Sequence, residues 1–142
     1  MIMFISDLER AADSIDINIR TLAIKKHALK LEFSHQGLLE IQAMHAQVVK
    51  VASMGINAYD TPHMCEIAIQ LKRDLAKLEI TYRENHISRL NQGLRETINT
   101  SSIHLDLLSE YRRIASLLCN HAYATTKIKA SDTRAEPESE DA

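Results

Sequence analysis

The sequence predicts an all-α protein, an up-down antiparallel four-helix bundle, and three observations support this fold class. Apolar residues recur seven apart, and three or four apart, along four long segments, which is the period of helices that pack along a seam. Three glycines and two prolines in 142 residues, with 4% aromatic residues, offer little of the turn and strand chemistry that a sheet protein uses. Three short links join the segments, which places consecutive helices antiparallel.

The first helix is expected over residues 3–33. Its seam has two rows with seven-residue spacing, which are Leu8, Ile15, Leu22 and Leu29, and Ile5, Ala12, Ile19, Lys26 and Phe33. Ser6 to Glu9 has the spacing of a capping box, yet the apolar pattern begins before it, so we expect an earlier start and an apolar turn that a partner covers. Cations near the end are expected to complement the helix dipole rather than to bind an anion, and they are Lys25, Lys26 and Lys30.

The second helix is expected over residues 35–58, after a brief link near Ser34. Its inner stripe contains Leu38, Ile41, Met44, Val48, Val51 and Ala52. His45 falls on the same stripe as its one polar member. We therefore expect it to be a core histidine satisfied by a hydrogen bond, in preference to a metal ligand.

The third and fourth helices complete the predicted domain, residues 1–127. The third begins with Thr61 as its N-cap and Pro62 as its first residue, ends at Gly93, and carries the stripe Met64, Ala68, Leu71, Leu75, Leu78, Tyr82, Ile87 and Leu90. The fourth begins at Ser101 or Ser102 and ends near Lys127, with Leu107, Leu108, Tyr111, Ile114, Ala115, Leu118 and Ala122 facing inward. Residues 128–142 are polar and acidic, which predicts a disordered tail.

Composition argues against several classes of function. A formal net charge of −2 lacks the basic surplus of a nucleic-acid-binding protein. Cys65 and Cys119 form no paired motif and are expected to be free thiols in a reducing compartment. No apolar run approaches the length of roughly 18–20 residues that spans a membrane, so we expect a chain that is cytoplasmic or held at the inner face of a membrane. Phosphate-binding loops and catalytic motifs are missing, which predicts that the chain is not an enzyme.

A group of carboxylates near the start is the one candidate for a metal site. Glu9, Asp13 and Asp16 are four and three residues apart, so on a helix they share one face beside the apolar seam. Clustered carboxylate oxygens suit hard divalent cations or iron. The alternative is a solvated acidic strip close to a helix N-terminus, where negative charge is favoured. No other cofactor is expected.

Three segments resemble the PhoU-type family of phosphate-signalling proteins. Residues 5–13 resemble the family's LERIGD signature, and residues 107–120 look like a second copy of it. Residues 78–91 are similar to the end of the family's long helix, which typically reads REEHIRRLN. The resemblance covers nearly the whole chain except the acidic tail. It implies that the four helices correspond to the last four of the family's six.

The resemblance also implies which metal ligands remain. Each family signature places a Glu and an Asp four apart, and these help to bind a multinuclear metal cluster. The first copy keeps both, as Glu9 and Asp13, whereas the second has Arg112 and Ser116. The second metal site is therefore expected to be lost and the first to be a remnant, with Arg112 neutralising an acidic group of the bundle. Further oxygens could come from the third helix, through Asp74 and Glu79.

These points predict a non-enzymatic regulatory module of phosphate transport and homeostasis that acts through protein contacts. PhoU-like domains occur alone and at the C-terminus of sodium/phosphate cotransporter-type membrane proteins, and the degenerate metal motifs with the acidic tail favour the second context. The expected partner is the membrane domain of a phosphate transporter or a homodimer mate. Two alternatives stay open, which are a metal-binding helical module that uses the residual carboxylates and a structural adaptor bundle.

Overall fold

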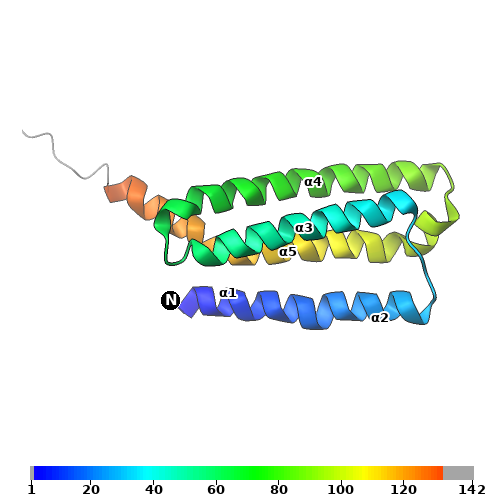
Figure 1. The fold of residues 1–142 in the computed structure, drawn as a ribbon, viewed down its shortest axis with the longest axis horizontal. Helices are drawn as coiled ribbons and strands as arrows, with labels where there is room; N and C mark the ends of the chain where they lie inside the picture. The colour runs from blue at the N-terminus through cyan, green and yellow to red at the C-terminus, as the bar shows by residue number, and fades with distance from the viewer. Residues whose placement is uncertain (1, 133–142) are drawn as a thin grey trace, which may run out of the picture.

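The computed structural model describes residues 2–132, and within that range every long element is a helix. The first rod consists of α1 (Ile2–Asp13), a π-helical segment (Ser14–Ile19) and α2 (Arg20–Ala28). It is followed by α3 (His35–Asn57), a 3₁₀ turn (Pro62–Met64), α4 (Cys65–Asn91) and α5 (Arg95–Asp132). The four rods alternate in direction (Figure 1), which confirms the predicted all-α four-helix bundle.

The rods do not contribute equally to the core. Helices α3, α4 and α5 each pack on the other two, whereas α1 and α2 pack on α5. Most of the fully buried apolar side chains lie in the three-helix part, and they include Met44, Val51, Cys65, Leu75, Leu108 and Cys119. The cysteines are both free, as predicted. The N-terminal rod therefore lies against a core that the other three helices largely form.

The first helix ends earlier, and the fourth begins earlier, than the sequence predicts. The first helix ends at Ala28 rather than near residue 33, because Lys30 adopts a left-handed conformation with φ 52°. The fourth begins at Arg95 rather than at Ser101. Thr97 and Thr100 are poor helix formers, but both are buried in this first turn and a half, and the Thr100 hydroxyl donates to the Glu96 carbonyl at 2.7 Å.

The ends of the other helices follow local signals. Ser34 caps α3 by accepting a hydrogen bond from the Gly37 amide at 3.2 Å. The predicted side-chain cap at Thr61 is wrong, because the chain first makes the 3₁₀ turn and α4 begins without a side-chain cap. Gly93 has φ 73° and lies between α4 and α5, as expected for a residue that ends a helix. Helix α5 continues five residues past Lys127, to Asp132, and the rest of the predicted tail lies outside the described residues.

Three predicted stripe positions of α3 and α4 are exposed, and so are four predicted seam positions of the first rod, which are Ile5, Ala12, Ile15 and Leu29. Leu38 is 43% exposed and Ile87 is 52% exposed, and His45 is also exposed, so the prediction of a core histidine is wrong. The stripes of α3 and α4 are rotated relative to the predicted ones. The inner faces of these two helices therefore include buried polar side chains, namely Glu40, Glu79, His86 and Arg89.

None of the helices within residues 2–132 combines the length and the apolar character that crossing a bilayer requires.

Candidate interaction groove and buried polar clusters

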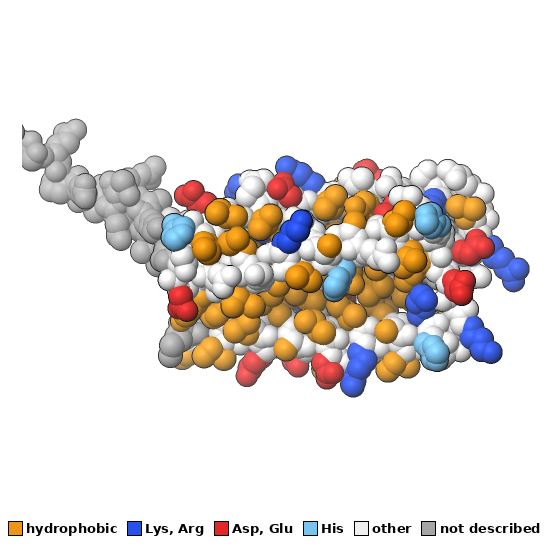
Figure 2. All heavy atoms as spheres, in the orientation of Figure 1, with side chains coloured by type: hydrophobic (Ala, Val, Ile, Leu, Met, Phe, Trp, Pro, Cys, Tyr) orange, Lys and Arg blue, Asp and Glu red, His pale blue; other side chains and the backbone are white. Residues whose placement is uncertain are grey.

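An apolar groove of about 530 Å³ runs between the N-terminal rod and α3, with α5 as its floor. Figure 2 shows the band of hydrophobic side chains that lies between these rods. The lining residues come from all three helices and are Leu8, Ala11, Ala12, Ile15, Ile19, His45, Val48, Val49, Ala52, Ile56, Tyr111, Ile114 and Leu118. Because interiors of folded proteins contain few voids larger than a water molecule, an apolar hollow of this size is an unfilled surface rather than a packing defect.

Polar contacts on a neighbouring face of the N-terminal rod join it to α5. Asn120 donates to Asp7 at 3.1 Å, near the start of the rod. In the π-helical segment, Ser14 and Asn18 both donate to the same oxygen of Glu110, Asn18 at 3.0 Å. These contacts orient the rod so that the adjacent face, with Leu8 and Ile15, lines the groove.

The three carboxylates of the candidate metal site lie on the outer edge of this rod. Glu9 follows Leu8, Asp13 follows Ala12 and Asp16 follows Ile15, so each comes one residue after a side chain that lines the groove. All three are exposed, and Asp16 forms a surface ion pair with Arg20 at 3.6 Å. Acidic side chains gather along this outer edge (Figure 2).

Within residues 2–132, no group of three or more histidine, cysteine or carboxylate side chains is placed to hold a metal ion. The set Glu9, Asp13 and Asp16 would therefore need donor atoms from another molecule, as a homodimer mate would provide. Metal binding stays a prediction, and elemental analysis of the purified protein tests it. Iron or zinc that disappears in the Glu9→Gln/Asp13→Asn variant would support the metal site.

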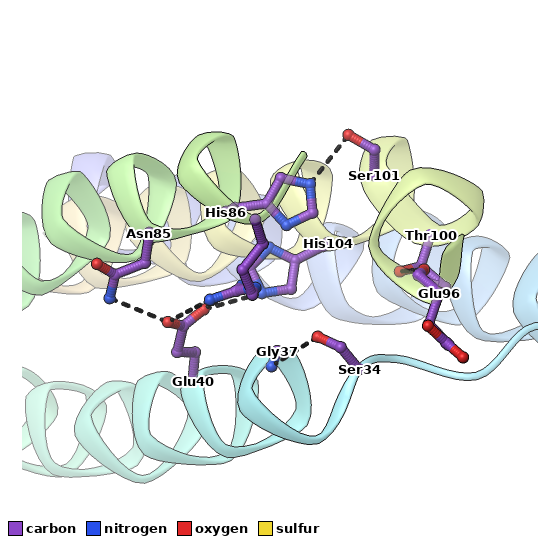
Figure 3. A network of polar contacts seen from close by, with 10 residues as sticks. Ser34, Gly37, Glu40, Asn85, His86, Glu96, Thr100, Ser101 and His104 are labelled. Carbon is purple, nitrogen blue, oxygen red and sulfur yellow. Dashed lines mark hydrogen bonds and ion pairs between the residues drawn. The ribbon is translucent and has the colours of Figure 1, made fainter. Parts of the chain in front are cut away.

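A buried polar cluster lies at the end of the bundle where α3 begins (Figure 3). Arg89 of α4 binds Glu40 of α3 through two parallel hydrogen bonds, with Nη1–Oε1 at 2.9 Å and Nη2–Oε2 at 2.7 Å. Asn85 donates to the same carboxylate at 3.0 Å. Glu40 is 1% exposed and Arg89 is 8% exposed, so this is a desolvated ion pair with the fork geometry that arginine favours.

Two stacked histidines extend the cluster into α5. The rings of His86 and His104 lie 4.5 Å apart and nearly parallel, and His86 forms a 3.0 Å hydrogen bond with the Ser101 hydroxyl. His104 Nε2 lies 3.5 Å from Glu40, which is longer than an ordinary hydrogen bond. Burial lowers the pKa of His104 to about 4, helped by the neighbouring His86 and opposed by Glu40. Burial also lowers the pKa of His86, so at neutral pH both rings are uncharged.

A second cluster surrounds Glu79 of α4. Arg112 of α5 donates to Glu79 at 2.6 Å, and Arg83 donates to its other oxygen. Although burial works to raise the pKa of Glu79, the hydrogen bonds and charges of the two arginines outweigh it and lower that pKa. The expectation that Arg112 neutralises an acidic group is confirmed.

The other residues of the predicted site take separate positions. Asp74 pairs with Lys77 at 3.5 Å and accepts a hydrogen bond from Gln70 at 3.0 Å, while Ser116 is half-buried on α5. Since the carboxylate of Glu79 is held by two arginines, it is not available to the exposed group at Glu9. The structure thus brings Arg112 and Glu79 together and leaves the N-terminal carboxylates apart from them.

Sequence analysis missed Glu40, Arg89 and His104, although a signal for them was present. From Leu75, steps of four and three residues along α4 reach Glu79, Tyr82, His86 and Arg89. Similarly, Glu40 comes four residues before Met44, and His104 comes four residues before Leu108. Complementary charges at seam positions of two helices are the pattern that predicts a buried pair.

Comparison with known proteins finds relatives that share the same name. The chain is 31% identical over 129 residues to the "putative inorganic phosphate export protein YjbB" of Salmonella typhimurium, and equally to the proteins of that name from Escherichia coli K12 and O157:H7. The match covers 89% of this chain and 24% of each relative, so the chain spans about a quarter of their length. No protein-family model matches the chain, and no solved structure matches it.

Proposed function

We propose that this chain is a non-enzymatic regulatory module of phosphate export and homeostasis that acts through protein contacts. The observation that carries the proposal is the open apolar groove between the N-terminal rod, α3 and α5. Large exposed apolar surfaces on folded domains mark places where another molecule binds. The names of the relatives supply the connection with phosphate.

The polar clusters support a structural rather than a chemical role for the charged residues. Glu40 is bound by Arg89 and Asn85, and Glu79 by Arg83 and Arg112. A general acid or base needs a titratable group that reaches a bound substrate. These carboxylates are instead buried and occupied by cations, and the groove is lined by aliphatic side chains with His45 and Tyr111 at its wall and floor.

The size of the relatives supports a place beside a transporter. Because the matched region is 24% of each relative, most of those proteins lies outside it. A helical module that is one part of a larger export protein, or that binds one, fits both this length and the PhoU-like resemblance. We propose that the larger part is of the sodium/phosphate cotransporter type and that the module lies on its cytoplasmic side.

Phosphate efflux from the native host tests the proposal. Cells are loaded with radioactive phosphate, and efflux is compared between the parent gene and a gene with Ala12→Glu, which places a charge in the groove. Ala43→Glu is the matched control, because Ala43 is also exposed on a helix but does not line the groove. We expect Ala12→Glu to change efflux several-fold at equal protein level and Ala43→Glu to leave it unchanged. Equal efflux in all three strains would contradict the proposal.

A further inference from the structure

We infer that the groove binds one amphipathic helix of the phosphate-transport polypeptide, with an apolar seam that enters the groove and Lys or Arg beside that seam. The inference rests on the proposed function and names the partner of the same surface. It is carried by the spacing of the lining residues and by the charge at the outer edge of the N-terminal rod.

The lining residues form three seams with helical spacing. On each helix most of them recur three or four residues apart, as Leu8, Ala12, Ile15 and Ile19 on the first rod, His45, Val49, Ala52 and Ile56 on α3, and Tyr111, Ile114 and Leu118 on α5. The other two lining residues, Ala11 and Val48, lie beside these rows. From Leu8 to Ile19 the seam is about 16 Å long, at a rise of about 1.5 Å per residue. Parallel seams of this period form the holes that receive the side chains of a further helix.

The chemistry of the walls favours a helix over other occupants. An added strand binds through unpaired backbone groups of a sheet edge, but the walls here are helices whose backbone groups are already bonded. Small-molecule sites place several polar groups so that they converge on the ligand, whereas two lining residues, His45 and Tyr111, carry polar atoms in their side chains. A helix that presents apolar side chains at three- and four-residue spacing covers these apolar walls and leaves no backbone polar group in its own middle turns without a hydrogen bond.

The acidic edge predicts the charge of the occupant. Glu9 and Asp16 each follow a seam residue, Leu8 and Ile15, on the side of the rod away from α5. In coiled coils the residues at such flanking positions pair with opposite charges on the neighbouring helix and select the partner. Both carboxylates are exposed, and Asp16 already pairs with Arg20 at 3.6 Å, so they contribute to the choice of partner more than to the affinity.

The same edge argues against a second copy of this chain. In a second copy, the N-terminal rod is one element with unburied apolar surface, through Ile2, Met3 and Ile5 near the start of α1, and α3 and α4 have further exposed apolar side chains. The outer edge of the N-terminal rod carries Glu9, Asp13 and Asp16, of which Asp16 is paired with Arg20, so the rods of two copies would bring the carboxylates of Glu9 and Asp13 together at the rim. A basic helix from the rest of a transport polypeptide avoids this repulsion.

Binding of two designed peptides tests the inference. Both are fluorescent helices of about 20 residues with Leu and Ile at the seam positions, and they differ in having Lys or Glu at the flanking positions. We expect the whole chain to bind the Lys peptide at least tenfold more tightly than the Glu peptide. Ala12→Glu should weaken binding of the Lys peptide at least tenfold, and Ala43→Glu should leave it unchanged.

Charge reversal tests the assigned charge of the occupant, and analytical sedimentation tests whether a second copy of the chain occupies the groove. In the Glu9→Lys/Asp16→Lys variant, the preference for the Lys peptide should disappear or invert. Equal binding of both peptides by the parent chain would overturn the assigned charge, and binding that survives Ala12→Glu would overturn the assigned place. A dimer that Ala12→Glu dissociates, with neither peptide bound, would assign the groove to a second copy. Failure of these tests with an intact effect of Ala12→Glu on efflux would overturn this inference and leave the proposed function standing.

Discussion

Arg112 of α5 and Glu79 of α4 form an ion pair in which Nη1 lies 2.6 Å from Oε2. The resemblance to PhoU-type proteins places a carboxylate at position 112, so the chain has a cation at the point where a metal ligand is expected. Glu79 is nearly completely buried, and Arg83 holds its other oxygen. This ion pair therefore links α4 to α5.

Reversing the charge of Arg112 should destabilise the bundle. Arg112→Glu places a second carboxylate beside Glu79, which is then left with one arginine, and we expect a loss of about 2–4 kcal/mol in the free energy of unfolding. Urea denaturation measures this loss. Arg113→Glu is the control, because Arg113 is exposed on the same turn, and it should change stability by less than about 0.5 kcal/mol. Equal effects of the two substitutions would show that the contact with Glu79 contributes nothing.

The Glu40–Arg89 pair should show strong energetic coupling. Glu40→Ala leaves the Arg89 guanidinium buried without its partner, and we expect a cost of about 3–5 kcal/mol. Replacing both residues, as Glu40→Leu/Arg89→Met, should cost less than Glu40→Ala alone, since no uncompensated charge remains. Urea denaturation of the single and double variants gives the coupling energy. Glu84→Ala, at an exposed position of α4, controls for the loss of a carboxylate, and a coupling energy near zero would contradict the prediction.

His104 should make stability depend on pH. Its pKa is about 4 in the folded chain and about 6.5 when unfolded, so between these values the unfolded chain binds a proton that the folded chain does not. The stabilisation is complete above about pH 6.5, and it is lost progressively as the pH falls to about 4, by about 3 kcal/mol in total. Burial of His86 acts in the same direction.

Comparison with a variant isolates the contribution of His104. Urea denaturation at several pH values between about 7.5 and 4 should give a smaller decrease of stability for His104→Leu than for the parent. His35→Leu is the control, because His35 is exposed at the start of α3, and its pH dependence should equal that of the parent. If His104→Leu and the parent lose stability equally on acidification, the assignment of His104 as a buried, uncharged histidine is wrong.

The number of rods could be predicted from the period of the apolar residues, and their alternating direction from the short links between them. On α5 the prediction holds at every inward position, from Leu107 to Ala122. On α3 and α4 the predicted stripe is rotated, since it includes the exposed Leu38 and Ile87 and leaves out the buried Glu40 and His86. Apolar character alone cannot identify a buried polar residue whose partner lies on another helix, because the partner is known only once the helices are packed.

The groove shows a second limit of prediction from sequence. Residues such as Ala12 and Ile15 belong to the predicted seam, and they do form it, but no helix within residues 2–132 fills the hollow that they line. The spacing of apolar residues along a helix indicates which side chains favour burial, but it does not indicate which element or partner covers them. The early apolar start of α1 was the signal for a missing partner, and the left-handed Lys30 that ends the rod had no such signal.

Two residues of the predicted α4 stripe should differ sharply in their contribution to stability. Leu75 is fully buried and Ile87 is 52% exposed. We expect Leu75→Ala to cost about 2–5 kcal/mol, and Ile87→Ala to cost less than about 1 kcal/mol. Thermal melting followed by circular dichroism ranks the two variants. A charged substitution, Leu75→Asp, should unfold the bundle, and a melting curve equal to that of the parent would refute the core assignment.

Gly55 lies where α3 packs closely against the backbone of α5, and Gly55→Ala should test how rigid that contact is. A Cβ at this position would lie 2.6 Å from the Leu118 carbonyl oxygen, which is backbone and cannot rotate away as a side chain can. Alanine favours the helix by about 1 kcal/mol over glycine, but we expect the clash to outweigh this and the variant to lose about 1–3 kcal/mol. Ser53→Ala, an exposed position on the same helix, should be neutral or slightly stabilising. Because Leu118 also lines the groove, a shift of α5 in Gly55→Ala should weaken binding of the Lys peptide, and a stabilised variant would show that the two helices separate freely at this point.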